Sequence, residues 1–130
     1  MPSHPHEELA RALWKAVSTA DLETLARLTT DDITWHASGR GPKSGDYQGR
    51  EVVLDYLASL GEDSDEFVTE LSDVLVGDLH TALLYRVTGR RGERRLETGY
   101  VLLLRMELDR LAEAWSVARD QYAVDAFWAE

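Results

Sequence analysis

The sequence places one carboxylate where an acid or a base could act on a bound ligand. Asp120 follows the last predicted strand of the chain, and the small residues Ser116 and Ala118 share its alternation. Removing a proton next to a carbonyl group needs a base with a raised pKa, and an apolar pocket raises the pKa of a carboxyl group. We therefore predict Asp120 as a catalytic acid or base. A surface ion pair with Arg119, or a turn cap, is the alternative.

His36 is the second candidate for proton transfer, because imidazole titrates near neutral pH. Strict alternation with Trp35 points the two side chains to opposite faces of a strand. Aromatic side chains with polar tips are expected to form the wall of a pocket, and they pack equally well in an ordinary core. The predicted ligand-binding residues are Trp35, Tyr56, Tyr85, Tyr100 and Ser116.

Residues 34–51 contain glycines and a Lys-Ser pair, as phosphate-binding loops do. A Walker loop needs a glycine directly before the lysine, but Pro42 precedes Lys43, and Ala37 stands where the first glycine is required. The dinucleotide-binding spacing is not met either. We therefore predict a connection from a strand to a helix, with turns made by the glycines and Pro42.

The composition restricts the classes of function. The net charge of -10 disfavours nucleic acid and anionic membranes as partners. The absence of cysteine excludes thiol catalysis, and His4, His6 and His80 lack the spacing of a metal site, so we expect neither a metal nor a cofactor. Neither a signal peptide nor an apolar stretch of about 20 residues is found, and we therefore expect a soluble, cytoplasmic protein.

Three segments show apolar residues at helical spacing. One begins at Glu7, a second follows Asp21 as its N-cap, and a third covers residues 52–60 and ends at Gly61. Between the second and the third, β-branched and aromatic residues predict a short strand over residues 33–35.

From residue 67 onward the pattern changes to long alternating segments. The predicted strands cover residues 67–76, 79–88, 96–107 and 111–119. The short turns between them indicate an antiparallel meander. At one of these turns lie Arg90, Arg91, Arg94 and Arg95, and charge at a turn tip usually serves solubility rather than phosphate binding. Helices followed by strands predict an α+β domain over residues 1–130, in which the sheet curls around the helices.

The third long strand shows which side chains face the helices. Charged residues alternate with the others, so Thr98, Tyr100, Leu102, Leu104 and Met106 should point inward. The outward face also carries Val101 and Leu103 among its charges, and this pattern suggests a second buried contact. We therefore predict a homodimer.

Several segments resemble the SnoaL-like branch of the nuclear transport factor 2-like superfamily. They are TADLETLARLTTDDITW, SGDYQGREVVLDYL and ARDQYAVDAFW, together with the four long strands. The resemblance covers nearly the whole chain. It implies a cone-shaped α+β half-barrel with an apolar pocket between sheet and helices, commonly dimeric through the outer face of the sheet. This superfamily hosts isomerases, polyketide cyclases, epoxide hydrolases, dehydratases and non-catalytic modules, so the fold alone assigns no activity.

The catalytic residues of two related groups are not retained. Ketosteroid isomerases of this fold use a carboxylate base, a tyrosine and a protonated aspartate, and the matching positions here are Ala37, Leu13 and Leu102. Limonene epoxide hydrolases add an Arg and Asp pair on an inner strand face, and residues 98–106 provide no such pair. SnoaL-like cyclases are similar in having an aspartate near the end of the last strand, where Asp120 lies.

The resemblance therefore implies a cofactor-free cyclase or isomerase that moves a proton on a small apolar or aromatic carbonyl compound. A non-catalytic ligand-binding or dimerisation module is the alternative.

Overall fold

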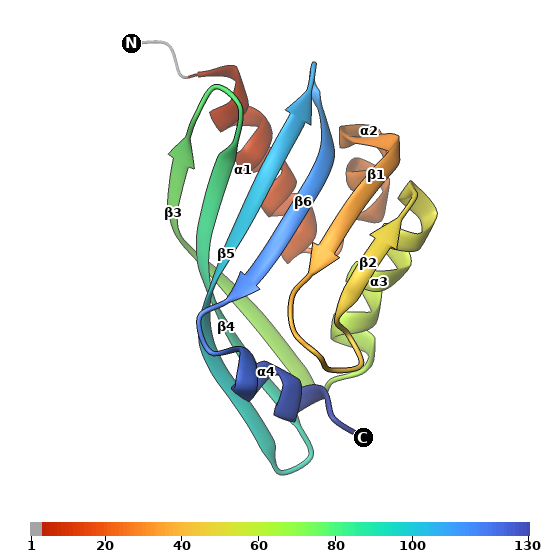
Figure 1. Cartoon of the computed structure of the whole chain (residues 1–130), viewed down its shortest axis with the longest axis vertical. Coiled ribbons are helices and arrows are strands. Elements are labelled where there is room, and N and C mark those ends of the chain that lie inside the picture. The colour runs from red at the N-terminus through yellow and green to blue at the C-terminus, as the bar shows by residue number, and fades with distance from the viewer. Residues whose placement is uncertain (1–3) are drawn as a thin grey trace.

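The computed structural model describes residues 4–130, in which helices cover one face of a six-stranded sheet (Figure 1). The helices are α1 (Pro5–Ser18), α2 (Leu22–Leu28), α3 (Arg50–Glu62) and α4 (Gln121–Trp128). The strands are β1 (Thr29–Ala37), β2 (Gly45–Gln48), β3 (Glu66–Val76), β4 (Thr81–Arg91), β5 (Arg94–Glu107) and β6 (Arg110–Ala118). Their order in the sheet is β2-β1-β6-β5-β4-β3.

The sheet joins two parts of the chain that are far apart in sequence. Strands β3 to β6 form the antiparallel meander that the turn spacing predicts. Strand β1 lies beside β6 and runs parallel to it, with Trp35 opposite Ala114 and Ala37 opposite Ser116. Strand β2 completes the edge by pairing antiparallel to β1. The sheet is therefore mixed, with one parallel pair near its centre.

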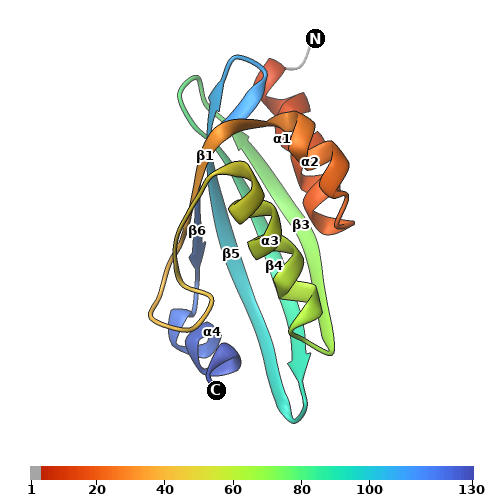
Figure 2. The same ribbon diagram turned by 90° about the vertical axis from the view of Figure 1, so that its right-hand side faces the viewer.

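The helices divide into a group on the sheet face and one helix at its end. Figure 2 shows α1, α2 and α3 on one side of the sheet, with α4 at the lower end beside the β1–β2 loop. The predicted N-cap of α2 is confirmed, because the Asp21 carboxylate accepts a hydrogen bond from the Thr24 amide at 3.1 Å. The first cluster of buried apolar side chains lies under α1 to α3, and it includes Leu13, Leu25 and Val53.

Helix α4 covers a second apolar cluster. Its side chains Val124, Phe127 and Trp128 pack against Val87 of β4 and Leu96 of β5. This helix was not predicted from the sequence. The signal was present, because Asp120 is a typical N-cap residue and the apolar residues 124, 127 and 128 have the spacing of a short amphipathic helix.

The arginines of the β4–β5 turn hold the C-terminal end of α4. Arg91 donates hydrogen bonds from Nη1 to the carbonyl oxygens of Phe127 at 2.6 Å and Ala129 at 3.3 Å. Arg94 also donates to the Ala129 carbonyl oxygen. These are carbonyl groups that a helix end leaves without intrahelical partners. Two of the arginines therefore have a structural role beyond solubility.

Several boundaries differ from the sequence-based predictions, and the long strands are shifted by one to three residues at their ends. Helix α3 does not end at Gly61 but continues to Glu62, with Asp63 as its C-cap. Gly61 is not among the glycines with positive φ, so it does not adopt the left-handed conformation that ends many helices. Strand β1 is longer than predicted and begins at Thr29, because its pairing with β6 extends the strand over polar residues.

The predicted inward face of β5 is confirmed. Thr98, Leu102 and Leu104 are buried on the helix side of the sheet. On the opposite face Val101 remains 40% exposed, and its cross-strand neighbour Val117 remains 48% exposed. Within residues 4–130 no helix covers this outer face, as both views show.

Candidate functional site

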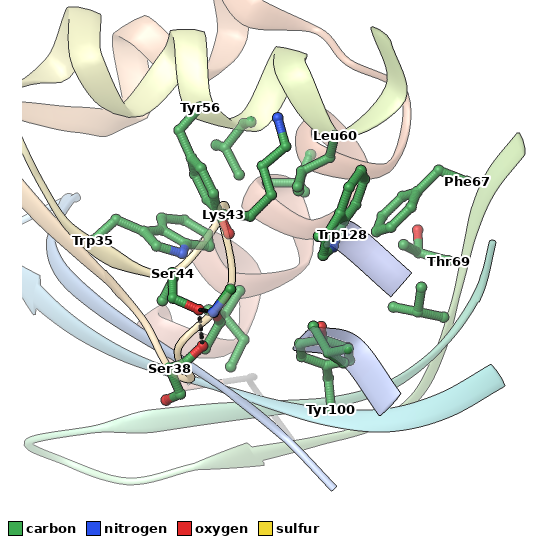
Figure 3. Close-up of a pocket in the computed structure, with 18 of the residues that line it drawn as sticks. Trp35, Ser38, Lys43, Ser44, Tyr56, Leu60, Phe67, Thr69, Tyr100 and Trp128 are labelled. Carbon is green, nitrogen blue, oxygen red and sulfur yellow. Dashed lines mark hydrogen bonds between the residues drawn. The ribbon is translucent and has the colours of Figure 1, made fainter. Parts of the chain in front are cut away.

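A partly enclosed cavity lies between the inner face of the sheet and α3 (Figure 3). The β1–β2 loop and α4 form its rim, and the remaining walls come from α1 and the long strands. The centre of a water molecule can occupy about 70 Å³ of this space, so the room between the side chains exceeds that figure. Aromatic and aliphatic side chains dominate the lining, which is typical of small-molecule sites.

All five predicted ligand-binding residues lie at this cavity. They are Trp35 of β1, Tyr56 of α3, Tyr85 of β4, Tyr100 of β5 and Ser116 of β6. Strand alternation places the four strand residues on the inner face, and Tyr56 points down from the helix above them. Their role in ligand binding stays a prediction.

The aromatic rings support one another and form a fixed wall. Tyr85 stacks on Tyr100 with ring centroids 5.3 Å apart and planes 15° apart. The Trp14 ring packs against the Tyr85 ring, with their centroids 4.8 Å apart. On the opposite side Tyr56 lies 6.3 Å from Trp35, measured between ring centroids. Rings held from several sides lose little conformational entropy on binding, and their faces suit a flat apolar molecule.

The phenol groups of the cavity are uncharged donors. Burial raises the pKa of Tyr56 well above its ordinary value, and a contact with the Ser116 hydroxyl offsets only part of this effect. Burial also raises the pKa of Tyr85, and it raises the pKa of Tyr100 to about 12, with a contribution from the nearby Asp125 carboxylate. These phenols therefore stay protonated at neutral pH.

The indole nitrogen of Trp35 is buried without a partner. Trp35 is 4% exposed, and its Nε1 atom makes no hydrogen bond within residues 4–130. In Figure 3 this nitrogen lies on the lower edge of the indole ring, on the side of Ser44, which also lines the cavity. A buried N–H group normally has a partner, so this one calls for a physical explanation.

The glycine-containing loop forms the rim rather than a phosphate cradle. The Ser44 hydroxyl donates to the Ser38 carbonyl oxygen at 2.9 Å and accepts from the Gly41 amide at 3.1 Å. Lys43 donates to the Ser59 hydroxyl at 2.9 Å and forms an ion pair with Asp63. The Lys43 ammonium group is therefore engaged by α3. The predicted direct connection from a strand to a helix is wrong, because β2 lies within this segment and the loop joins β1 to β2.

One carboxylate does line the cavity, and it is Asp125 of α4. It accepts hydrogen bonds from the Arg40 amide and from Gln121 Nε2, both at 3.1 Å. The loop reaches it because Gly39 has a φ of +106°, and a Cβ atom there would lie 2.5 Å from Asp125 Oδ1. The sequence-based prediction missed Asp125 because it missed α4.

Asp120 does not lie where the predicted catalytic role requires it. Its exposed side chain accepts a hydrogen bond from the Ala123 amide at 3.1 Å and thereby caps α4. It is not one of the cavity residues, and its carboxylate forms no ion pair with Arg119. The strand ends at Ala118, so strand alternation no longer determines the direction of residue 120.

His36 lies on the outer face, opposite the cavity. Its Nδ1 atom is 2.7 Å from Asp46 and its Nε2 atom is 2.6 Å from Glu113, while its ring stacks on Trp115. The hydrogen bond with Glu113 raises the pKa of His36, and Asp46 adds to this effect. This placement follows the alternation with Trp35 and puts the imidazole out of reach of a cavity ligand.

The described residues give no sign of a metal site or of a membrane span. Within residues 4–130 no three histidine, aspartate or glutamate side chains come close enough together to hold a metal ion. In the same part of the chain no helix is long and apolar enough to cross a membrane.

Comparison with known proteins identifies the family. A family model described as a SnoaL-like domain matches residues 10–114. The chain belongs to the SnoaL-like family. This SnoaL-like assignment confirms the resemblance seen in the sequence, and the structural neighbours place the α+β architecture in the cystatin-like, nuclear transport factor 2-like fold. A comparison with curated proteins found no match.

Three solved structures illustrate the similarity of this SnoaL-like chain. Bal32a, from a soil-derived mobile gene cassette, is 28% identical with a TM-score of 0.91, over 95% of this chain and 96% of that one. A Xanthomonas campestris protein of unknown function with a cystatin-like fold is 28% identical with a TM-score of 0.87, over 95% and 97%. A Jannaschia sp. CCS1 protein, whose description suggests a SnoaL-like polyketide cyclase, is 14% identical with a TM-score of 0.80, over 96% and 92%.

Proposed function

We propose that this SnoaL-like chain binds a small, largely apolar or aromatic molecule in the cavity between α3 and the sheet. The observation that carries the proposal is the partly enclosed cavity walled by stacked aromatic rings, with a few uncharged donors among them. Apolar walls with a small number of placed polar groups are the usual composition of a ligand site.

A thermal-shift screen with bicyclic aromatic ketones and hydrocarbons tests this proposal. A ligand that binds only the folded state must raise the melting temperature. Ser116→Leu extends a side chain into the cavity, so it should abolish the ligand-induced shift. Val117→Leu adds a methylene group to the next residue of β6, on the outer face, and should leave the shift intact.

The absence of a shift with every compound would contradict the binding proposal and favour the dimerisation module. Equal shifts in the native protein and in Ser116→Leu would also contradict it, because the ligand would then bind elsewhere.

A second candidate function is cofactor-free proton transfer, as in a cyclase or an isomerase. The observation that favours it is the carboxylate of Asp125 at the cavity wall, close enough to influence the phenol of Tyr100. The description of the Jannaschia protein points to the same class of reaction. In this scheme a carboxylate removes a proton from the carbon next to a carbonyl group, and the electron pair moves to the carbonyl oxygen.

Deuterium exchange at C2 of 1-tetralone in D₂O measures this step directly by NMR. Asp125→Asn removes the base while keeping a similar shape, so the exchange rate should fall by about 100-fold. Asp120→Asn keeps a good N-cap for α4 and tests the base predicted from the sequence. A rate that falls in Asp120→Asn alone would assign the role to Asp120, and a rate unchanged in both variants would reject catalysis by either carboxylate.

We also propose a homodimer formed through the outer face of the sheet. An apolar patch, called here the outer patch, supports this assembly. It consists of Leu84, Val101, Leu103, Trp115 and Val117. Contiguous exposed apolar surface is a common feature of protein interfaces.

A further inference from the structure

The unpartnered indole N–H of Trp35 carries a more specific inference, which rests on the proposed ligand-binding function. We propose that Trp35 Nε1 donates a hydrogen bond to the carbonyl oxygen of the bound molecule. The ligand is then an aromatic or alicyclic ketone, or its enolate, rather than a pure hydrocarbon or a carboxylic acid.

The indole N–H of Trp35 is unfavourably placed without a partner. A buried donor without an acceptor destabilises a protein, because it has lost its hydrogen bonds to water and gained none. Three buried side-chain atoms lack a partner within residues 4–130, namely Thr30 Oγ1, Thr81 Oγ1 and Trp35 Nε1. Of these three residues Trp35 alone lines the cavity. An acceptor atom of a ligand would satisfy the indole group.

The polar groups near the indole are also neutral hydrogen-bond donors. An indole N–H donates and cannot accept, so the ligand atom facing it must be an acceptor. The Tyr56 phenol is protonated at neutral pH, burial raises its pKa further, and the Ser116 hydroxyl contacts it. All three groups are neutral and can donate, and they come from β1, α3 and β6.

The cavity suits a carbonyl oxygen better than a carboxylate. A carboxylate that leaves water needs a cation or several strong donors to offset its lost hydration. The Lys43 ammonium group at the rim already pairs with Asp63 and donates to Ser59. A ketone oxygen carries no full charge, and an enolate spreads its charge over several atoms, so both suit a site with neutral donors.

A matched pair of ligands isolates the proposed hydrogen bond. 1-Tetralone and tetralin have the same bicyclic framework and differ at one carbon, which carries the carbonyl oxygen in the ketone. Trp35→Phe keeps an aromatic ring and removes the N–H. We expect the native protein to bind the ketone about three- to tenfold more tightly than the hydrocarbon, and Trp35→Phe to remove this preference.

Trp115→Phe is the control for the general effect of losing an indole. Trp115 lies on the outer face against His36, away from the cavity. Its substitution should leave both affinities, measured by calorimetric titration, unchanged.

An NMR measurement on the native protein gives a second readout of the proposed hydrogen bond. The four tryptophans give four indole N–H signals, and Trp35→Phe identifies the one that belongs to Trp35. Addition of 1-tetralone should move this proton signal downfield, as hydrogen bonding does, and tetralin should not.

The possible outcomes separate this inference from the function on which it rests. Binding of both compounds with equal affinity, or a ketone preference that survives in Trp35→Phe, would overturn the role of the indole while keeping the cavity as a ligand site. Binding of neither compound to the native protein would overturn the proposed function for this ligand class, and the inference with it.

Discussion

At the scale of the residue, one imidazole joins two carboxylates on the outer face of the sheet. Asp46 approaches His36 from β2, and Glu113 approaches it from β6. Arg105 of β5 donates to Glu113 from the other side at 3.2 Å. This row of alternating charges crosses four neighbouring strands, β2, β1, β6 and β5, and it lies beside the outer patch.

The stability that His36 provides should depend on pH. The pKa of His36 is raised above its ordinary value of 6.5, mainly by Glu113. A raised pKa in the folded state means that the stabilisation is complete below pH 6.5 and is lost as the pH rises through the raised pKa. The hydrogen bond with His36 lowers the pKa of Glu113 from 4.5, so the carboxylate is ionised throughout this range.

His36→Gln should therefore destabilise the protein more at pH 6 than at pH 8.5. The difference should not exceed about 1 kcal/mol, because the group is partly exposed and solvent screens the pair. Urea denaturation of both proteins at the two pH values measures it. If the difference in unfolding free energy between the native protein and His36→Gln were the same at both pH values, the interaction would not depend on the charge of the imidazole.

The opposite placements of Trp35 and His36 could be predicted from the sequence because strand alternation is a local rule. The same rule could not be applied to Asp120, which lies beyond the end of its strand. There the direction of the side chain depends on the helix that follows. It also depends on the hydrogen bond that the Thr98 hydroxyl accepts from the Asp120 amide. The indole that lacks a partner could not be predicted either, because hydrogen-bond satisfaction depends on residues from several strands.

At the scale of the element, the β1–β2 loop and α4 form one contact that closes the cavity. The Arg40 amide donates to Asp125, and Gly39 allows the approach because a side chain there would collide with Gln121 and Asp125. Helix α4 is fixed at its beginning by Asp120 and at its end by Arg91 and Arg94. The rim of the cavity is therefore held from three directions.

Gly39→Ala should loosen this contact. The new Cβ atom would lie 2.3 Å from Gln121 Nε2, in a backbone conformation with positive φ that alanine adopts with strain. We expect a loss of about 1–3 kcal/mol in unfolding free energy, together with faster hydrogen exchange at the Arg40 amide.

Gly45→Ala is the matched control. Gly45 also has a positive φ, of +135°, but a Cβ atom there would meet nothing within 4 Å. It should therefore show the cost of backbone strain alone and leave the exchange rate at Arg40 unchanged. If the two variants behaved alike, the close approach of the loop to α4 would have no energetic importance.

At the scale of the whole molecule, the two faces of the sheet have different surroundings. The inner face is covered by helices and contains the cavity, while the outer patch is partly exposed in the part of the chain that the structure describes. The helix-rich beginning and the meander could be predicted from hydrophobic spacing, because both are made of neighbouring residues. The parallel pairing of β1 with β6 could not, because it joins distant segments. The short strand β2 could not either, because its residues Gly45–Gln48 show no apolar alternation.

Val101→Lys should produce a monomer if the outer patch forms the dimer interface. A lysine at this position would have to bury its charge against the partner's apolar surface, which is strongly unfavourable. Molecular mass from light scattering coupled to gel filtration measures the effect. Leu79→Lys is the control, since Leu79 is 78% exposed in the turn between β3 and β4. A native protein that is already monomeric would contradict the proposed dimer.

The parallel pair β1–β6 also governs the order in which the chain can fold while it is being made. The hairpins from β3 to β5 can form as soon as their residues leave the ribosome, because each strand pairs with the next. Strand β1 leaves earlier and can pair with β2 at one edge, but its other edge, where Trp35 lies opposite Ala114, must wait for β6. For most of its synthesis the nascent chain thus carries a strand with one unpaired edge, a feature that favours aggregation and that chaperones counteract.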